Sequence, residues 1–373
     1  MTTTSTPSGG ASLAGSDFSG DQRATTLQGA GREYLDRLRG GDMGALPAVL
    51  GLIVLGIVFT VLRPETFPSF GNLANLTVQA GAICVLAMGL VPVLLLGEID
   101  LSAGVAGGAS AGVMAILINN KGWPWPAAVL GAVVTGLVIG VAIGLLVSRL
   151  GIPSFVVTLA FFLGIQGITL KLIGAGGTVP VRNATIVGIA NNNLPVTWGW
   201  VLAIVVVVAY AVTELLRLQR QMSRNLQHPP TALVVARIIA LAVVILAFAY
   251  ILNSNRARVA TFTLAGVPYV VPIVGVLLVI WTFVLGRTAY GRHVYAVGGN
   301  AEAARRAGIN VQMIRISVFM IGSSMAALSG IVAASRLNAV TPDAGAGNTL
   351  LYAVGAAVIG GTSLFGGKGR PRD

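Results

Sequence analysis

The chain has 373 residues, of which 55% are apolar and only 10% are charged, and its mean hydropathy is +0.85. A soluble domain carries about 25% charged residues, so this composition excludes a soluble globular protein and a disordered one. Lys and Arg outnumber Asp and Glu by 24 to 12, but no basic run is interleaved with aromatic side chains that stack on bases. The excess of Lys and Arg is therefore typical of the cytoplasmic loops of a membrane protein, and it does not indicate binding to nucleic acid.

Residues 1–44 differ in composition from the rest of the chain. Residues 1–30 are rich in Thr, Ser and Gly and poor in large apolar side chains, which favours disorder. Residues 32–42 carry charges of both signs and are compatible with a short surface helix. No apolar core follows a short basic start, as a secretory signal requires. We therefore expect a cytoplasmic tail at 1–44, followed by a transmembrane domain at 45–367.

After this tail, long stretches without Asp, Glu, Lys or Arg recur along the chain. A helix that crosses a bilayer needs about 20 mainly apolar residues. Open sheet edges cannot lie in hydrocarbon, and the stretches lack the alternation of barrel strands, so helices are predicted. The fold class is therefore an all-α polytopic membrane protein with about ten transmembrane helices. The ten stretches cover residues 44–62, 66–97, 101–120, 122–148, 150–170, 183–213, 238–255, 259–286, 316–335 and 344–367.

The distribution of Lys and Arg predicts the orientation of these helices. If the N-terminus lies inside and every stretch crosses once, 17 Lys and Arg residues lie in inside loops and 7 in outside loops. If residues 101–120 instead turned back, the arginine clusters at 217–237 and 287–315 would face outward. We therefore expect a cytoplasmic N-terminus and a crossing at 101–120, with a broken helix near 97–118. Within the fourth stretch, Gly136, Gly140 and Gly144 form a face that lets helices approach closely.

Two carboxylates lie between the second and third stretches, in the segment Gly97-Glu98-Ile99-Asp100-Leu101-Ser102. A charge inside a membrane costs several kcal/mol unless it is solvated or paired, so such residues are functional candidates. Broken helices line substrate paths in transporters. The alternative for Asp100 or Ser102 is a capping role, in which the side chain accepts the first backbone N–H groups of the next helix. Glu98 has no comparable structural explanation.

A long basic loop at 288–315 is predicted to contain a short cytoplasmic helix. Asn300 is a suitable N-cap, residues 301–307 favour a helix, and Gly308 is placed to end it. The segment is either a solvated positive-inside loop or a helix that docks into a groove of another protein.

Several kinds of site are not expected. Residues 366–368 resemble the end of a P-loop, but Thr362 and Gly369 replace the Gly and the Ser or Thr that the motif needs. The single cysteine, Cys84, allows no intrachain disulfide and no cysteine-based metal site. His228 and His293 are not spaced as metal ligands, and no nucleophile–base motif of an enzyme is present. We expect no metal, no cofactor and no enzymatic activity.

Four motifs together resemble the membrane permeases of bacterial monosaccharide ABC importers, the family that includes ribose and xylose permeases. The match runs from about residue 45 to residue 369, and Glu98 and the extra length at 190–265 make the chain most similar to the xylose branch. The motifs are Gly97-Glu98-Ile99-Asp100-Leu101-Ser102, Gly151-Ile152-Pro153-Ser154-Phe155 with Thr158-Leu159, Gly298-Gly299-Asn300 with Glu302-Ala303-Ala304 and Gly308-Ile309-Asn310, and Gly361-Thr362-Ser363-Leu364-Phe365-Gly366-Gly367.

The resemblance implies a division of labour in the cytoplasmic membrane. This chain would form half of a translocation path, as a homodimer, while a separate cytoplasmic ATPase and an extracytoplasmic sugar-binding protein supply energy and substrate. In the family, further apolar sequence follows the last motif, whereas residues 368–373 here form a short basic tail, which implies a shortened chain. The residues that the resemblance assigns to ATPase coupling are Gly298, Asn300, Glu302, Ala303, Ala304 and Gly308.

A neutral monosaccharide needs hydrogen-bonding groups along its path. For each candidate hydroxyl or amide, the alternative is a hydrogen bond to its own helix or to a neighbour. Two other functions stay open: a permease of branched-chain amino acid ABC importers, and an ion- or proton-coupled secondary carrier that uses Glu98 and Asp100. The candidate path residues are Gln79, Glu98, Asp100, Ser102, Ser110, Thr158, Gln166 and Asn348.

Overall fold

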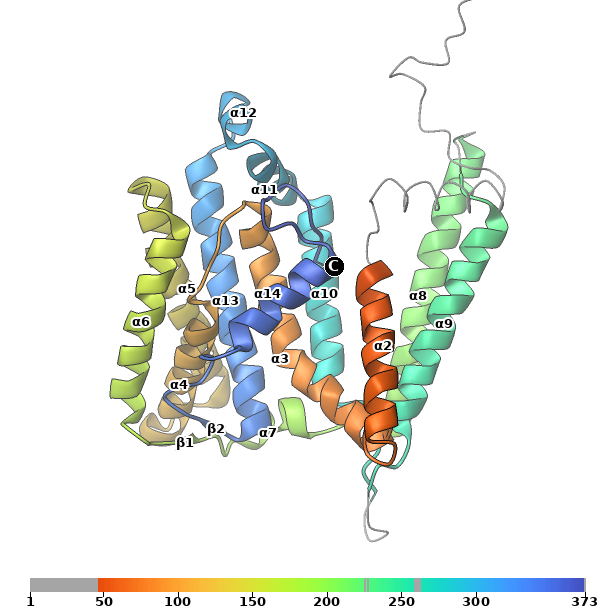
Figure 1. Ribbon diagram of the computed structural model, residues 1–373, viewed down its shortest axis with the longest axis horizontal. Helices are drawn as coiled ribbons and strands as arrows, with labels where there is room; N and C mark the ends of the chain where they lie inside the picture. Colours follow the sequence, from red (N-terminus) through yellow and green to blue (C-terminus); the bar gives the residue numbers. More distant parts are fainter. Residues whose placement is uncertain (1–45, 225, 227, 258–262, 372–373) are drawn as a thin grey trace, which may run out of the picture. The chain divides into compact units, whose positions relative to one another are not determined.

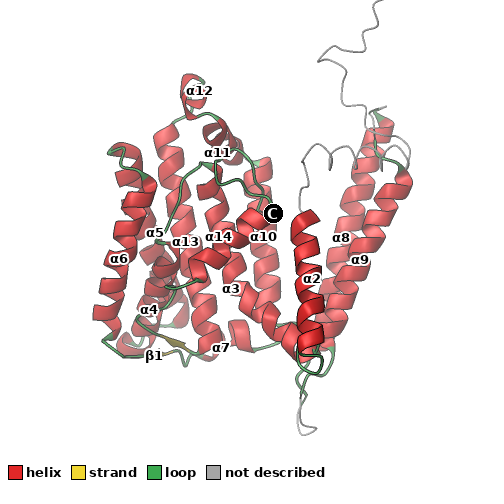
Figure 2. Cartoon of the chain, viewed as in Figure 1, coloured by secondary structure: helices red, strands yellow, loops and turns green. Residues whose placement is uncertain are grey.

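The computed structural model describes residues 46–371, except residues 225, 227 and 258–262. The predicted tail at 1–44, its helix at 32–42 and the last two residues of the basic tail lie outside the described residues. Within the described ranges almost every element is a helix (Figure 2), and the one sheet pairs β1 (Val179–Pro180) with β2 (Ala339–Val340) in antiparallel register. The all-α prediction is confirmed.

The helices follow one another with short connections (Figure 1). In chain order they are α2 (Leu46–Leu62), α3 (Phe70–Leu95), α4 (Ala103–Lys121), α5 (Trp125–Arg149), α6 (Ser154–Ile173), α7 (Ala184–Asn191), α8 (Val196–Ser223), α9 (Thr231–Asn253), α10 (Val270–Arg287), α11 (Ala289–Gly299), α12 (Ala301–Arg306), α13 (Val311–Leu337) and α14 (Thr349–Gly360).

The chain forms two compact units. Among the described residues, one unit consists of residues 201–248, which are most of the α8–α9 hairpin, and the other consists of residues 46–200 and 249–371. The larger unit contains every motif that the sequence singled out.

Eight helices of the described chain are long and apolar enough to cross a membrane: α3 to α6, α8 to α10, and α13. Helix α2 is apolar but has 17 residues. Helix α14 has 12 residues, about 18 Å of helix against a hydrocarbon core of about 30 Å, because Gly361 ends it in a left-handed conformation. The sixth charge-free stretch is divided between α7 and α8. The expected count of ten spans and the cytoplasmic N-terminus stay predictions.

Helix α13 lies at the centre of the larger unit, where it packs against α3, α4 and α5. The α5 face formed by Gly136, Gly140 and Gly144 lies directly on α13, as the spacing predicts. A Cβ atom at Gly140 would lie 2.7 Å from Met320 Cα, and one at Gly144 would lie 2.8 Å from Ile316 Cα. Contacts this close leave no room for any side chain, so the backbones themselves pack together.

The helix interruption expected near 97–118 is narrower than predicted. Helix α3 ends at Leu95 and α4 is continuous from Ala103 to Lys121, so the break covers residues 96–102 only. Helix α4 continues through Gly104 without interruption. A side chain at this position would collide with the carbonyl of Gly345, so glycine is needed here for close packing and not for a bend.

Candidate functional site

Three motifs that lie far apart in the sequence meet at one place, which we call the junction: residues 95–102, 298–300 and 365–369. The N–H of Gly367 donates a hydrogen bond to the carbonyl of Leu95, 2.9 Å away. A side chain at Gly298 would collide with the same carbonyl, and one at Gly366 would lie 3.0 Å from Gly97 N and 3.1 Å from Gly298 O. Backbone therefore touches backbone at the junction, with no side chain between the three segments.

Residues 96–102 are held in an ordered, non-helical conformation. Asp100 is buried, and its Oδ1 accepts hydrogen bonds from the N–H of Ser102 at 2.9 Å and from the hydroxyl of Ser102 at 2.6 Å. On the other side, Ser154 Oγ accepts from the N–H of Ile99, and the hydroxyl of Thr158 lies 3.2 Å from the Ile99 carbonyl. Asp100 Oδ1 thus accepts both donors of Ser102, the residue that precedes α4, and the Ser102 side chain itself makes no capping hydrogen bond to α4.

Glu98 has a partner that sequence reasoning missed. Its Oε1 lies 3.3 Å from Nε of Arg315, at the start of α13, and the Glu98 side chain is only 14% exposed. The two residues are 217 positions apart, and no spacing or motif indicates their contact. The ion pair joins the interrupted segment to α13, and it compensates the charge that made Glu98 a candidate.

The short helix predicted after Asn300 is present as α12. Asn300 Oδ1 accepts the N–H of Ala303 at 2.9 Å, which is the predicted N-cap, and Gly308 has a φ of +84° just after the helix. Glu302 is exposed and pairs with Arg305 and Arg306 along the helix surface. Glu302, Arg305 and Arg306 form the exposed face of α12, whereas Ala304 is buried and packs with residues of the bundle.

Helix α11 connects α12 to the bundle. The hydroxyl of Tyr290 lies 3.1 Å from that of Ser317 on α13, and burial raises the pKa of Tyr290 against a smaller lowering effect of this hydrogen bond. The hydroxyl of Tyr295 donates to the carbonyl of Gly369 at 2.7 Å. The start of the basic tail is therefore hydrogen-bonded to α11.

The remaining path candidates do not converge on one pocket. Ser110 is buried and donates to the carbonyl of Ala106, one turn earlier on its own helix. Thr158 does the same with Ser154, in addition to its contact with Ile99. Gln79 and Asn348 are exposed and Gln166 is half-buried.

A cavity of about 350 Å³ lies between α3, α4, α13 and the segment before α14. Its walls are mainly Gly and Ala, and its few polar groups are hydroxyls; none of the described residues that line it is charged. Sequence reasoning did not select these residues, because small side chains carry no chemical signal by themselves. The polar lining residues are Ser329, Thr341 and Thr349, and the close-packed glycines Gly104, Gly107 and Gly108 form one wall.

Comparison with known protein families shows which family this chain belongs to. Residues 72–367 match the family model described as the branched-chain amino acid transport system / permease component. This chain belongs to that family. The permease is therefore one component of a transport system, and its helices make it a multi-pass protein of the cytoplasmic membrane.

Among curated proteins, the permease is similar to two xylose transport system permease proteins. The one from Escherichia coli K12 is 36% identical over 321 residues, which are 86% of this chain and 79% of the relative. The one from Haemophilus influenzae is 32% identical over 335 residues, 89% of this chain and 86% of the relative. The ribose import permease protein of Escherichia coli K12 is 28% identical over 353 residues, 93% and 85% of the two chains.

These relatives are transport permeases and not enzymes. The xylose permeases share more residues with this chain than the ribose permease does, as the Glu98 motif and the added length predicted. No solved structure matches the chain.

Proposed function

We propose that this permease is the membrane subunit of an ATP-binding-cassette importer that carries a monosaccharide, xylose or a similar sugar, across the cytoplasmic membrane. The observation that carries this proposal is the 36% identity to a xylose transport permease over most of both chains. A separate cytoplasmic ATPase and an extracytoplasmic sugar-binding protein complete the system. We further propose that two copies of the chain form the path.

The junction supports a route from the ATPase to the path. The ATPase would bind the exposed face of α12, through the segment with Asn300, Glu302, Ala303, Ala304 and Gly308. A displacement of α12 moves α11, whose last turn touches Leu95 at Gly298. Because no flexible side chain separates these backbones, the displacement passes to residues 96–102 and then to α4 without being absorbed.

The cavity supports the neutral sugar as substrate. Its volume of about 350 Å³ is at the lower end for small-molecule sites, and hydroxyls are its only polar side-chain groups. Gln79 lies on α3 three residues before Ala82, so both are on one helix face, and Asn348 directly precedes Thr349. We propose that Gln79, Asn348, Ser329 and Thr349 bind sugar hydroxyls in turn when the cavity opens.

Asp100 would contribute at the inner end of this path. Its second oxygen, Oδ2, is buried and has no hydrogen-bond partner among the described residues. An ionised carboxylate oxygen accepts a sugar hydroxyl well. Asp100 would therefore bind the sugar through Oδ2 while Oδ1 continues to accept the hydrogen bonds of Ser102.

The test is sugar uptake into proteoliposomes that contain the permease, the ATPase encoded beside it and the binding protein. We expect xylose uptake that requires internal ATP and is unchanged by a proton ionophore. The double variant E302R/G308W should insert normally but lose the ATPase on co-purification, whereas Q312A, in the first turn of α13, should keep it. Uptake without ATP, or retention of the ATPase by the double variant, would contradict the proposal.

A second candidate function is favoured by the description of the matching family, which names branched-chain amino acids. In that case leucine, and not xylose, would be taken up in the same proteoliposomes. The secondary-carrier alternative lacks comparable support, since Glu98 is ion-paired and Asp100 is hydrogen-bonded to Ser102. Uptake driven by a proton gradient in the absence of ATP would restore it.

A further inference from the structure

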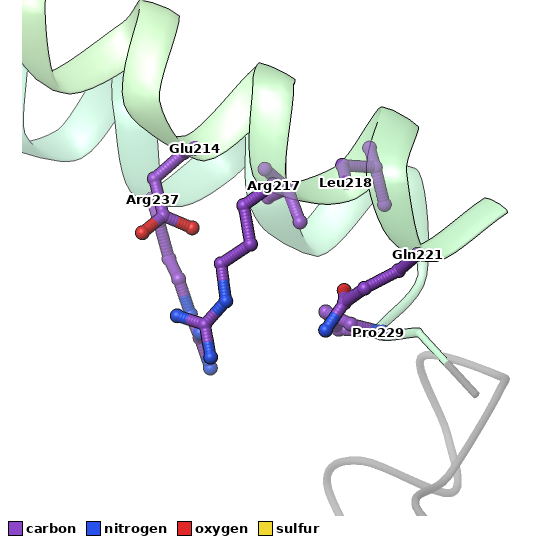
Figure 3. Close-up of a pocket in the computed structure, with 7 residues that line it drawn as sticks. Glu214, Arg217, Leu218, Gln221, Pro229 and Arg237 are labelled. Carbon is purple, nitrogen blue, oxygen red and sulfur yellow. The ribbon is translucent and has the colours of Figure 1, made fainter. Parts of the chain in front are cut away.

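The α8–α9 hairpin carries a small polar pocket that the transport mechanism does not use. Its volume is about 80 Å³, and it lies at the hairpin end where α8 finishes and α9 begins (Figure 3). The pocket is too small for a sugar-sized ligand, since small-molecule sites measure roughly 300–1,000 Å³. The residues that line it are Glu214, Arg217, Leu218, Gln221, Pro229, Val234 and Arg237.

Two arginines from different helices share this pocket. Arg217 is on α8 and Arg237 on α9, both side chains are exposed, and Figure 3 shows them extending to the same side of the hairpin. The buried side chains of Leu218 and Val234 form the apolar wall beside them. Among the described residues no ion pair joins Glu214 to either arginine, so the donors of both guanidinium groups remain available.

The pocket lies at the level where the apolar part of the hairpin ends. On α8 no charge occurs from Val196 to Thr213, and Glu214 is the first charged residue; on α9 no charge follows Arg237 up to Asn253. Both helices therefore leave the hydrocarbon at matching positions, and the phosphates of the lipids lie at this depth. Arg220 and Arg224 continue the positive charge along α8.

We propose that this pocket binds the phosphate group of an anionic phospholipid. Guanidinium groups donate pairs of parallel hydrogen bonds to phosphate oxygens, and two of them converge here from separate helices. The amide of Gln221 supplies a further donor, while Leu218 and Val234 contact the apolar part of the lipid next to the headgroup. A bound lipid would hold α8 and α9 together at this end. The proposal does not depend on which substrate the permease carries.

The test measures lipid binding to the delipidated full-length protein by native mass spectrometry. The probes are phosphatidylglycerol, phosphatidylcholine and inorganic phosphate. We expect phosphatidylglycerol to bind with at least about tenfold higher affinity than phosphatidylcholine, and millimolar inorganic phosphate not to displace it. Full displacement by inorganic phosphate would instead assign the pocket to a free anion, and equal binding of both lipids would overturn the proposal.

A matched pair of variants separates the pocket from general positive charge. R217Q/R237Q and R220Q/R224Q remove the same charge from the same hairpin, but only the first pair lines the pocket. We expect R217Q/R237Q to weaken phosphatidylglycerol binding about tenfold and R220Q/R224Q to weaken it less than about threefold. Equal losses in both would contradict a specific site.

One variant should gain affinity, which a misfolded protein cannot do. Glu214 is the only acidic residue that lines the pocket, and its carboxylate repels a phosphate there. E214Q is therefore expected to bind phosphatidylglycerol about threefold more tightly. Unchanged or weaker binding by E214Q would contradict the proposed position of the phosphate.

Discussion

The bundle around α13 and the α8–α9 hairpin are both made of long apolar helices, but very different shares of their residues are buried. In the most apolar window of each helix, 61% of the α13 residues and 67% of the α4 residues are buried, against 11% in α8 and 11% in α9. The difference follows residue size. Helix α4 begins with a run of Gly, Ala and Ser, while the middle of α8 is a run of Val and Ile. Small residues let helices approach one another, and branched apolar ones favour lipid contact when no partner helix is close. Apolar character therefore predicts a span, and the small residues of α4 explain its close packing inside the bundle.

The largest expected effect comes from filling a close contact between α5 and α13. In Gly140→Leu, the new Cβ atom would lie 2.7 Å from Met320 Cα. We therefore expect the substitution to lower the free energy of unfolding by about 3 kcal/mol or more and to prevent stable folding. The measurement is the yield of monodisperse protein and its unfolding temperature in detergent. Gly164→Leu on α6 is the control, because nothing lies within 4 Å of that position, and it should behave like the wild type. Similar behaviour of both variants would show that backbone contact does not define the inner bundle.

The junction should respond in function more than in folding. Gly298→Leu would push α11 away from the Leu95 carbonyl, and we expect ATP-dependent uptake to fall at least about tenfold although the protein still inserts. Gly299→Leu is a matched control one residue away, because no atom lies within 4 Å of a side chain there, and it should keep most of the uptake. Comparable loss in the control would argue against transmission through Gly298.

The Glu98–Arg315 pair should have an intermediate effect. Glu98→Gln leaves a partly exposed Arg315 without its counter-charge, and we expect a stability loss of about 1 kcal/mol, or an unfolding temperature lower by about 2–4 °C. In a double-mutant cycle, E98Q and R315Q should show a coupling of about 1 kcal/mol. Uptake that persists in E98Q and keeps its pH profile fits an ATP-driven permease. Complete loss of uptake, with stability retained, would instead revive a proton-transferring role for Glu98.

The smallest effect is expected on the hairpin surface. Ile239→Ala removes an apolar side chain that is 57% exposed, so the change in stability should stay within about 0.5 kcal/mol. Thermal unfolding in detergent and uptake in proteoliposomes both check this. A large loss in either measurement would identify this face as a contact with another protein chain, and would then remove the contrast with the inner bundle.

The sequence by itself determined the elements whose signals are local. Charge-free length predicted the spanning helices, the spacing of Gly136, Gly140 and Gly144 predicted the face that meets α13, and Asn300 with Gly308 predicted the bounds of α12. Local signals also have a limit: a charge-free stretch does not record where a helix stops. Gly361 ends α14 well before the charge at Lys368, and the stretch at 183–213 contains two helices.

Only the tertiary structure decided the contacts between distant segments. Glu98 and Arg315 are paired because α3 ends beside the start of α13, which no local pattern encodes. Leu95, Gly298 and Gly367 meet because the ends of α3 and α11 converge with the segment after α14, and glycine is required there by the neighbours and not by its own segment. The cavity wall is made of Gly and Ala, which become a site only through the helices that surround them. Long-range packing fixes these features, since the free energy of each contact depends on two chain segments at once, whereas a helix depends on residues only a few positions apart.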